Sequence, residues 1–347
     1  MTFTIFMNDR SGPFKAISLE EARSLRDQGW QAADLHVHTL CSPDVIPARS
    51  LHPEALYHKA REMGMGFVTF TDHDTMDAYD IAGWDREGLV TGVEIKIRDM
   101  RVVGHTIHLN VYDIDREQFQ ELEEIASEGD LICLLACLRK NDLPFIYNHP
   151  LWFEPGEGPN LAAIPEVVKL FPAVEYNMHR ISRKNEIAME LAKKYGKGLV
   201  AATDTHSGMI GKVYTIAPGD TFGEFFKNIL SGRSCIAVKD LTKQDLINEI
   251  NAWIDLVFDP DLIPYSKDCT TGTKYLDGLI SALESETLRD FPRICRYVLS
   301  LCHKISNSGL PASLYLRFEG SLIPEIERQM ATILVENAKC SQTHSSK

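Results

Sequence analysis

The sequence contains no long hydrophobic run, no Cys-x-x-Cys pair and no excess of basic residues, and each absence excludes a class of protein. No segment approaches the roughly 18 consecutive apolar residues of a membrane-spanning helix, so we expect no membrane partner. The N-terminus carries Asp9 and Arg10 and lacks the apolar core of a secretory signal, which predicts a cytoplasmic protein. We expect the eight cysteines to be reduced thiols.

The charge is acidic, with a formal net value of −13 over 347 residues. An acidic surface repels nucleic-acid backbones and anionic membranes, so nucleic acid is not an expected partner. A small phosphorylated substrate remains compatible with this charge, because bound metal ions can reverse the local field.

The order of patterns along the chain predicts three regions. Residues 1–30 form a short lead-in, in which Ser18 and Glu21 make a capping box that opens a helix. Over residues 31–240, strand and helix patterns alternate, which predicts a parallel α/β architecture and favours a barrel over an open sheet.

Strand patterns disappear after about residue 241, so residues 241–347 are predicted to form a helical C-terminal extension. Its expected helices cover roughly 243–258, 273–304 and 321–338. Three roles are open to it: packing on the barrel, forming a homo-oligomer, or covering the barrel mouth.

Two motifs place polar side chains two residues apart on predicted strands. Asp34, His36 and His38 alternate along one strand and therefore face the same side, where two imidazoles can bind one divalent metal. Asp204 and His206 repeat this spacing after a second apolar strand. The alternative for each is a polar strand face whose side chains are satisfied by hydrogen bonds.

Other strands end in, or contain, isolated polar groups. His73 follows an apolar run and His149 ends another, while Glu94 lies inside a third. A buried carboxylate is costly without a cation partner, which is either a metal or an arginine. His105 and His108 lie an odd number of residues apart on one strand, so only one of them is expected to point inward.

Together, five or six predicted strands carry His, Asp or Glu at or near their carboxyl ends, which a parallel barrel would gather at one mouth. Nitrogen and oxygen ligands without thiolate suit Zn, Mn or Fe. Arg180 follows the strand at 173–177 and could bind a phosphate there, with His179, Arg183 and Lys212 as weaker candidates. The alternative for these residues is a solvated helix start.

The motifs, taken in order, resemble those of the PHP (polymerase and histidinol phosphatase) superfamily. The matching segments are Asp34-Leu-His-Val-His-Thr, Ser42-Pro-Asp, Thr71-Asp-His-Asp, Gly92-Val-Glu, Ile107-His-Leu, Asn148-His-Pro and Asp204-Thr-His. The resemblance implies a distorted (β/α)7 TIM-like barrel over residues 31–240 that holds three divalent metal ions, which would be Zn, Mn or Fe. By position, the implied ligands of the first ion are His36, His38, Glu94 and Asp204. Those of the second are Glu94, His108 and His149, and those of the third are Asp44, His73 and His206.

The same resemblance implies metal-dependent hydrolysis of a small phosphate ester, either a phosphomonoester or a nucleotide. Glu94, as a bridging ligand, Asp204 and Arg180 would then be the catalytic residues. Asp34, Asp72 and Asp74 could orient the imidazoles. Three alternatives stay open: a nuclease or proofreading phosphodiesterase, a non-enzymatic metal-binding regulatory module, and an amidohydrolase-type C–N hydrolase, which the final Asp-x-His motif disfavours.

Overall fold

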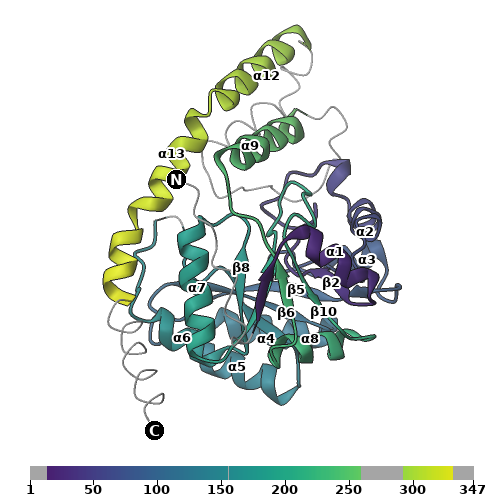
Figure 1. Cartoon of the computed structure of the whole chain (residues 1–347), viewed down its shortest axis with the longest axis vertical. Helices are drawn as coiled ribbons and strands as arrows, with labels where there is room; N and C mark the ends of the chain where they lie inside the picture. The colour runs from purple at the N-terminus through teal and green to yellow at the C-terminus, as the bar shows by residue number, and fades with distance from the viewer. Residues whose placement is uncertain (1–13, 155, 259–291, 331–347) are drawn as a thin grey trace.

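The computed structural model describes residues 14–154, 156–258 and 292–330, which form two β-sheets with surrounding helices and a helical extension (Figure 1). The strands are β1 (Lys15–Ile17), β2 (Gln31–Asp34), β3 (Phe67–Thr69), β4 (Leu89–Val90), β5 (Gly92–Arg98), β6 (Thr106–Tyr112), β7 (Phe145–Tyr147), β8 (Ala173–Asn177), β9 (Gly198–Ala202), β10 (Tyr214–Ala217) and β11 (Cys235–Ala237). The helices of the body are α1 (Leu19–Asp27), α2 (Pro53–Glu62), α3 (Asp77–Ala82), α4 (Arg116–Ser127), α5 (Leu131–Lys140), α6 (Ile164–Leu170), α7 (Ser182–Lys194) and α8 (Phe222–Leu230), with a 3-10 turn at Arg49–Leu51.

The mixed α/β class predicted from the sequence is confirmed. One sheet has the order β1-β11-β10-β2-β3-β4 and the other the order β5-β6-β7-β8-β9. Two isolated parallel bridges, Val37 with Thr205 and His73 with Glu94, connect the sheets beyond the ends of β2, β9 and β3. No closed sheet is found among the described residues, so the seven-unit barrel stays a prediction.

The expectation of an all-parallel architecture is wrong at two places. Strand β6 is antiparallel to both β5 and β7, and β10 is antiparallel to both β2 and β11. Only residues 99–105 connect β5 to β6, whereas a parallel return requires a crossover of about a dozen residues or more. The short elements β1, β10 and α3 were not predicted, because a few residues carry little periodic signal.

The lead-in forms the predicted helix and also contributes a strand. The backbone N–H of Glu21 donates to Ser18 Oγ over 3.2 Å, and the N–H of Ser18 donates back to Glu21 Oε2 over 2.9 Å, so the capping box on α1 is confirmed. Strand β1 pairs in parallel with β11, which attaches this segment to the six-stranded sheet.

The extension is helical in its described part, with α9 (Lys243–Val257), α12 (Pro292–Asn307) and α13 (Leu310–Ser321). Much of the predicted helix at 273–304, and the end of the one at 321–338, lie outside the described residues. Helix α13 lies between two of the predicted helices, in a segment for which no helix was predicted. Among the described helices, none combines the length and apolar character needed to cross a bilayer.

Helix α9 packs on α12 and α13 beside the two sheets, and α13 runs past α7 (Figure 1). Leu246 and Ile247 of α9 form an apolar cluster with Ala312 of α13. A buried ion pair joins α13 to the body, with Lys184 Nζ 2.9 Å from Glu319 Oε2. The extension is therefore packed against the body through both apolar and charged contacts.

Candidate metal centre

The nine predicted ligands meet at one edge of the two sheets. His36 and His38 follow β2, His73 follows β3, His149 follows β7, and Asp204 and His206 follow β9. His108 reaches the same edge from the amino-terminal part of β6, because β6 runs opposite to β7 and pairs Leu109 with Tyr147, the last residue of that strand. Asp44 lies in the loop after β2, and Glu94 lies in β5.

Glu94 is buried at the centre of this group, and each of its oxygens faces imidazoles. Oε2 lies 3.0 Å from His36 Nε2, 3.3 Å from His38 Nε2 and 3.2 Å from His73 Nδ1. Oε1 lies 3.1 Å from His108 Nδ1 and 3.3 Å from His149 Nε2. One carboxylate therefore connects two sets of nitrogen donors.

The first implied ligand set forms a compact group. The ligand atoms of His36, His38, Glu94 and Asp204 all lie within 4.8 Å of one another. The Nε2 atoms of His36 and His38 are 3.1 Å apart, and Asp204 Oδ1 is 3.3 Å from each. Two imidazole nitrogens this close repel unless a proton or a cation lies between them, so the donor set fits a divalent metal ion.

In the other two implied ligand sets, the grouping of the ligand atoms differs from the expected one. Asp44 Oδ2 lies 2.8 Å from His206 Nε2 and 3.3 Å from His73 Nε2, and His38 completes a group of four with them. The remaining metal-sized groups are His73 with Glu94 and His108, and His36 with His149 and Glu175. The implied set of Glu94, His108 and His149 is thus not one of the metal-sized groups, although both histidines contact Glu94.

Glu175 was not identified from the sequence. Its Oε1 lies 2.7 Å from His36 Nδ1, on the opposite side of the ring from Glu94, and its Oε2 accepts the backbone N–H of His149 over 2.8 Å. The signal was present, because Glu175 interrupts the apolar residues of β8 in the same way that Glu94 interrupts those of β5.

Further polar groups around the site were also missed. Asn148 Nδ2 donates to Glu94 Oε1 over 2.7 Å, Ser42 Oγ lies 3.3 Å from His38 Nδ1, and Glu154 Oε1 lies 3.3 Å from His108 Nε2. These groups fix the orientation of the carboxylate and of two rings, as outer partners of metal ligands usually do.

Asp34, Asp72 and Asp74 form their hydrogen bonds with groups other than imidazoles. Their expected role in orienting the histidine rings is therefore wrong. Asp34 accepts hydrogen bonds from the backbone and hydroxyl of Thr203, and Asp72 accepts the equivalent pair from Thr39. Asp74 accepts the backbone N–H of Lys96 over 3.1 Å. The aspartates therefore fix the loops that carry the ligands, while Glu175 and Ser42 contact the rings.

The charges of the cluster are strongly coupled. Burial alone would raise the pKa of Glu94, but the imidazoles of His36, His73 and His108 hold it well below its usual range. Burial opposes protonation of His206, yet Asp44 and Asp204 raise its pKa to about 10. For His149, burial dominates and lowers the pKa, so this imidazole is neutral. The neighbouring imidazoles thus favour the ionised form of Glu94.

Strained backbone is concentrated at the same place. Asp74, His149 and Asp204 have φ values of 49°, 24° and 52°, in the region that side chains other than glycine rarely occupy. Conformations of this kind persist where the surrounding structure enforces them, which is common at functional sites.

Seven of the nine predicted ligands, all except His36 and His38, line an open cavity of about 330 Å³ that Arg180 and Trp152 also border. The Arg180 guanidinium carbon lies 6.0 Å from the centre of the Trp152 ring, and its buried Nε has no hydrogen-bond partner in the described part of the chain. Arg183 instead forms ion pairs with Glu186, Glu190 and Glu327. Lys212 borders a different cavity.

His105 lies away from the cluster, as the odd spacing predicts. Its Nδ1 accepts the backbone N–H of Asn160 over 3.3 Å, and its ring packs edge-on against Phe153. His108 is the partner that turns inward, toward Glu94.

A family model described as "PHP-associated" matches residues 182–234, the segment from α7 to the start of β11 that includes Asp204 and His206. The matched segment contains the last of the ordered motifs, Asp204-Thr-His, and agrees with the resemblance that those motifs carry. A search of curated protein sequences found no match.

Several solved structures are similar to this chain. PsfC from Pseudomonas syringae PB-5123 is 16% identical, with 60% of this chain and 92% of that chain covered and a TM-score of 0.45. A putative metal-dependent phosphoesterase from Bifidobacterium adolescentis is 15% identical, with 60% and 97% covered and a TM-score of 0.41. The lesion-specific endonuclease PfuEndoQ from Pyrococcus furiosus is 14% identical, with 73% and 71% covered and a TM-score of 0.44.

Proposed function

We propose that this chain hydrolyses a small-molecule phosphate ester, a phosphomonoester or a nucleotide, with the help of three divalent ions that are Zn, Mn or Fe. The observation that carries the proposal is the position of Glu94, whose two oxygens each face imidazoles at 3.0–3.3 Å. A carboxylate with nitrogen donors on both sides is suited to bridge two cations.

Bound divalent ions would supply an activated water and neutralise charge on the phosphoryl oxygens. Glu94 and Asp204 would hold them with their ionised carboxylates, and the neutral His149 offers a free nitrogen without losing a proton. Glu175 would keep the Nε2 atom of His36 directed at the site by binding the other ring nitrogen.

Arg180 is proposed to bind the phosphate. It borders the metal cavity, and the buried Nε of its guanidinium lacks a hydrogen-bond partner among the described residues. A guanidinium binds phosphate oxygens with paired hydrogen bonds, which would turn the phosphorus toward the metal ligands.

We also propose the domain division and setting expected from the sequence. The barrel would comprise residues 31–240, preceded by the lead-in, and residues 241–347 would form the extension. The two bridges between the sheets support a ring of strands around the ligands, although they are single pairs. The lack of a disulfide among the cysteines of the described residues fits the cytoplasmic setting expected from the sequence.

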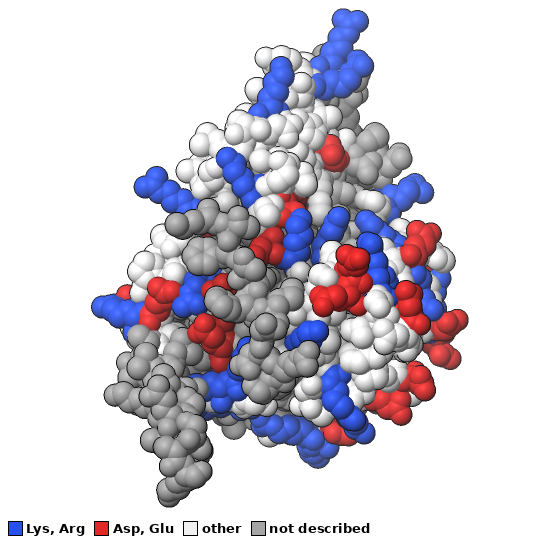
Figure 2. Space-filling view, in the orientation of Figure 1, with Lys and Arg blue, Asp and Glu red and all other residues white. Residues whose placement is uncertain are grey.

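A nuclease is the second candidate, because the same ligands could serve a phosphodiester. Figure 2 shows acidic and basic side chains interspersed on the face in view, without the clustering of basic residues that binding to a nucleic-acid backbone favours. The net charge of −13 also disfavours a long polyanion.

Metal analysis of the purified protein, combined with a screen of phosphorylated metabolites and oligonucleotides, tests the proposal. We expect bound Zn, Mn or Fe and turnover of at least one monoester or nucleotide. Cleavage of oligonucleotides alone would favour the nuclease. If no ester is hydrolysed by fully metal-loaded protein, a metal-binding regulatory module becomes the better description.

A further inference from the structure

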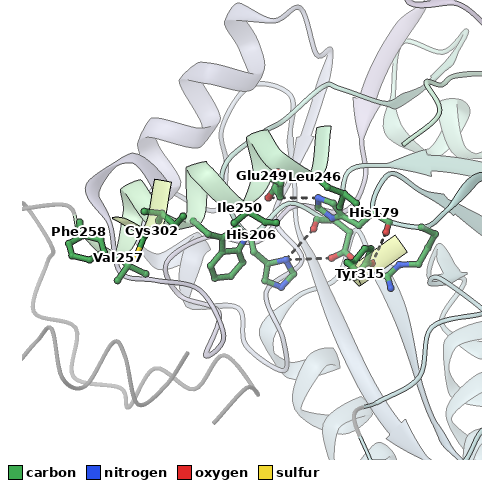
Figure 3. A pocket seen from close by; sticks show the side chains of 13 residues that line it. His179, His206, Leu246, Glu249, Ile250, Val257, Phe258, Cys302 and Tyr315 are labelled. Atoms are coloured by element: carbon green, nitrogen blue, oxygen red, sulfur yellow. Dashed lines mark hydrogen bonds and ion pairs between the residues drawn. The ribbon is translucent and has the colours of Figure 1, made fainter. Parts of the chain in front are cut away.

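A second and larger cavity, of about 580 Å³, adjoins the metal centre and is enclosed by the helical extension (Figure 3). Its volume lies within the range of small-molecule binding sites, roughly 300–1,000 Å³. Three residues, Arg180, Asp204 and His206, border both this cavity and the metal cavity. A ligand could therefore extend from one cavity into the other.

One whole face of α9 forms the wall of this cavity. The lining residues of α9 recur with helical spacing, so they form a single stripe along the helix. They are Leu246, Glu249, Ile250, Trp253, Ile254 and Val257. All but Glu249 are apolar, and Figure 3 shows labelled members of the stripe directed into the cavity. Ile250, Trp253 and Ile254 are only partly buried by the protein itself.

Glu249 and Tyr315, at the inner end of the cavity, are engaged in hydrogen bonds, whereas His179 Nε2 and Arg180 Nε are buried without a hydrogen-bond partner among the described residues. Glu249 accepts a hydrogen bond from Ser207 Oγ over 2.6 Å and lies 3.8 Å from His179 Nε2. Tyr315 of α13 donates to the backbone carbonyl of His179 over 3.0 Å. The Trp253 ring stacks near that of His206, with 6.2 Å between centres. These contacts fix the apolar wall beside the metal ligands.

We propose that this cavity binds the organic part of the substrate, so that the preferred substrate is a phosphate monoester of a bulky apolar or aromatic alcohol. The inference rests on the proposed phosphatase activity. With the phosphate held by Arg180 and the metal ligands, the ester oxygen would point toward Trp253 and Ile250. An apolar leaving group that packs against this stripe is removed from water, and the binding free energy gained is proportional to the apolar area buried.

The test compares 1-naphthyl phosphate with phenyl phosphate as substrates of the full chain, because the two aryl leaving groups have similar acidity and differ in apolar area. We expect kcat/KM to be on the order of 10-fold higher for the naphthyl ester, because its second ring buries additional apolar area in the cavity. Ile250→Asn should reduce this preference by about tenfold. The matched control is Ile132→Asn on α5, where the isoleucine is 50% exposed and far from the cavity lining, so the preference should not change.

Several outcomes would overturn the inference. If both esters react equally well, the phosphatase proposal survives and the apolar specificity fails. If neither ester reacts, calorimetric binding of 1-naphthyl phosphate decides: weaker binding to Ile250→Asn than to Ile132→Asn supports the cavity, and equal binding refutes it. A dimer that Ile250→Asn dissociates would show that a second copy covers the stripe, which also refutes it. Thermal melting of both variants verifies that each is folded.

Discussion

The carboxylate of Glu175 lies 2.7 Å from Nδ1 of His36, while Nε2 of the same ring faces Glu94 at 3.0 Å. The ring is thus held between two buried carboxylates, one inside the proposed ligand set and one behind it. A carboxylate bound to the ring nitrogen that faces away from the metal fixes the ring and increases its basicity as a ligand.

Glu175→Gln should therefore weaken metal binding without removing a ligand. We expect a loss of about 10- to 100-fold in affinity for the first ion, the usual effect of changing such a partner. Competition with a chelator of known affinity measures it. Glu166→Gln, at an exposed carboxylate on α6, is the control and should bind metal as the parent does. Unchanged affinity in Glu175→Gln would show that Glu175 only packs the core.

Replacing Glu94 tests the bridge itself. Glu94→Gln keeps the size of the side chain but removes the charge shared by both sets of imidazoles, so metal content and hydrolysis of p-nitrophenyl phosphate should fall together. We expect activity to drop by on the order of a thousandfold. Glu87→Gln, at an exposed carboxylate near Arg61, should change neither property. Parent-like activity in Glu94→Gln would refute the bridging role.

Replacing Arg180 tests substrate binding separately from metal binding. Arg180→Met should lower kcat/KM for the best ester by about 10- to 100-fold, since hydrogen bonds to charged groups contribute roughly 1.5–3 kcal/mol. Metal content should stay at the parent level, and Arg180→Lys should restore only part of the rate because lysine lacks the planar fork. Lys212→Met provides the comparison and should behave like the parent. A loss of metal in Arg180→Met would instead indicate a structural role.

Removal of the ions should affect stability as well as activity. Ligands that bind only the folded state stabilise it by about 2.7 kcal/mol at a concentration 100 times Kd. Dialysis against a chelator should therefore abolish hydrolysis and lower the melting temperature, and adding back Zn, Mn or Fe should restore both. Calorimetry with each ion in turn measures the shift. An unchanged melting temperature would show that the cluster binds no cation.

Most of the proposed ligands could be found from the sequence because they follow or interrupt apolar runs, whereas Asp44 was implied only by the resemblance. The spacing of His36 and His38 predicts a shared side of extended backbone, which in the structure lies just beyond β2, and Glu94 is conspicuous inside an apolar run. Glu175 carries the same local signal and was missed only because no second polar motif accompanied it. The direction of β6 was not inferred, although the short connection before it already required an antiparallel pair.

The groups contributed by α9 could not be found in this way. Glu249 and Trp253 lie more than 40 residues after His206, in a helix with ordinary amphipathic character. Their position beside the metal centre depends on how the extension packs, through Tyr315 and the Lys184–Glu319 pair, and long-range packing has no signature in local periodicity. The sequence therefore predicts the proposed ligands but not the wall of the adjoining cavity.

The Lys184–Glu319 pair offers a direct measure of how firmly α13 is attached. The two side chains are 2% and 7% exposed, and burial lowers the pKa of Lys184 although Glu319 opposes this effect. Removing one partner leaves a buried charge uncompensated, so Glu319→Gln should reduce the free energy of unfolding by about 3–5 kcal/mol. Lys184→Met with Glu319→Leu should cost less than the single change, because the double variant buries no unpaired charge.

Urea unfolding of the parent, Lys184→Met, Glu319→Leu and the double variant completes the cycle, and Glu319→Gln is measured beside them. The exposed pair of Lys169 and Glu166 is the control, and Glu166→Gln should change stability by less than about 1 kcal/mol. If Glu319→Gln changes the free energy of unfolding as little as Glu166→Gln does, solvent reaches the Lys184–Glu319 pair and α13 is only loosely attached to α7. The wall of the larger cavity would then lack the rigid support from Tyr315 that substrate selection requires, so this measurement also bears on the proposed apolar specificity.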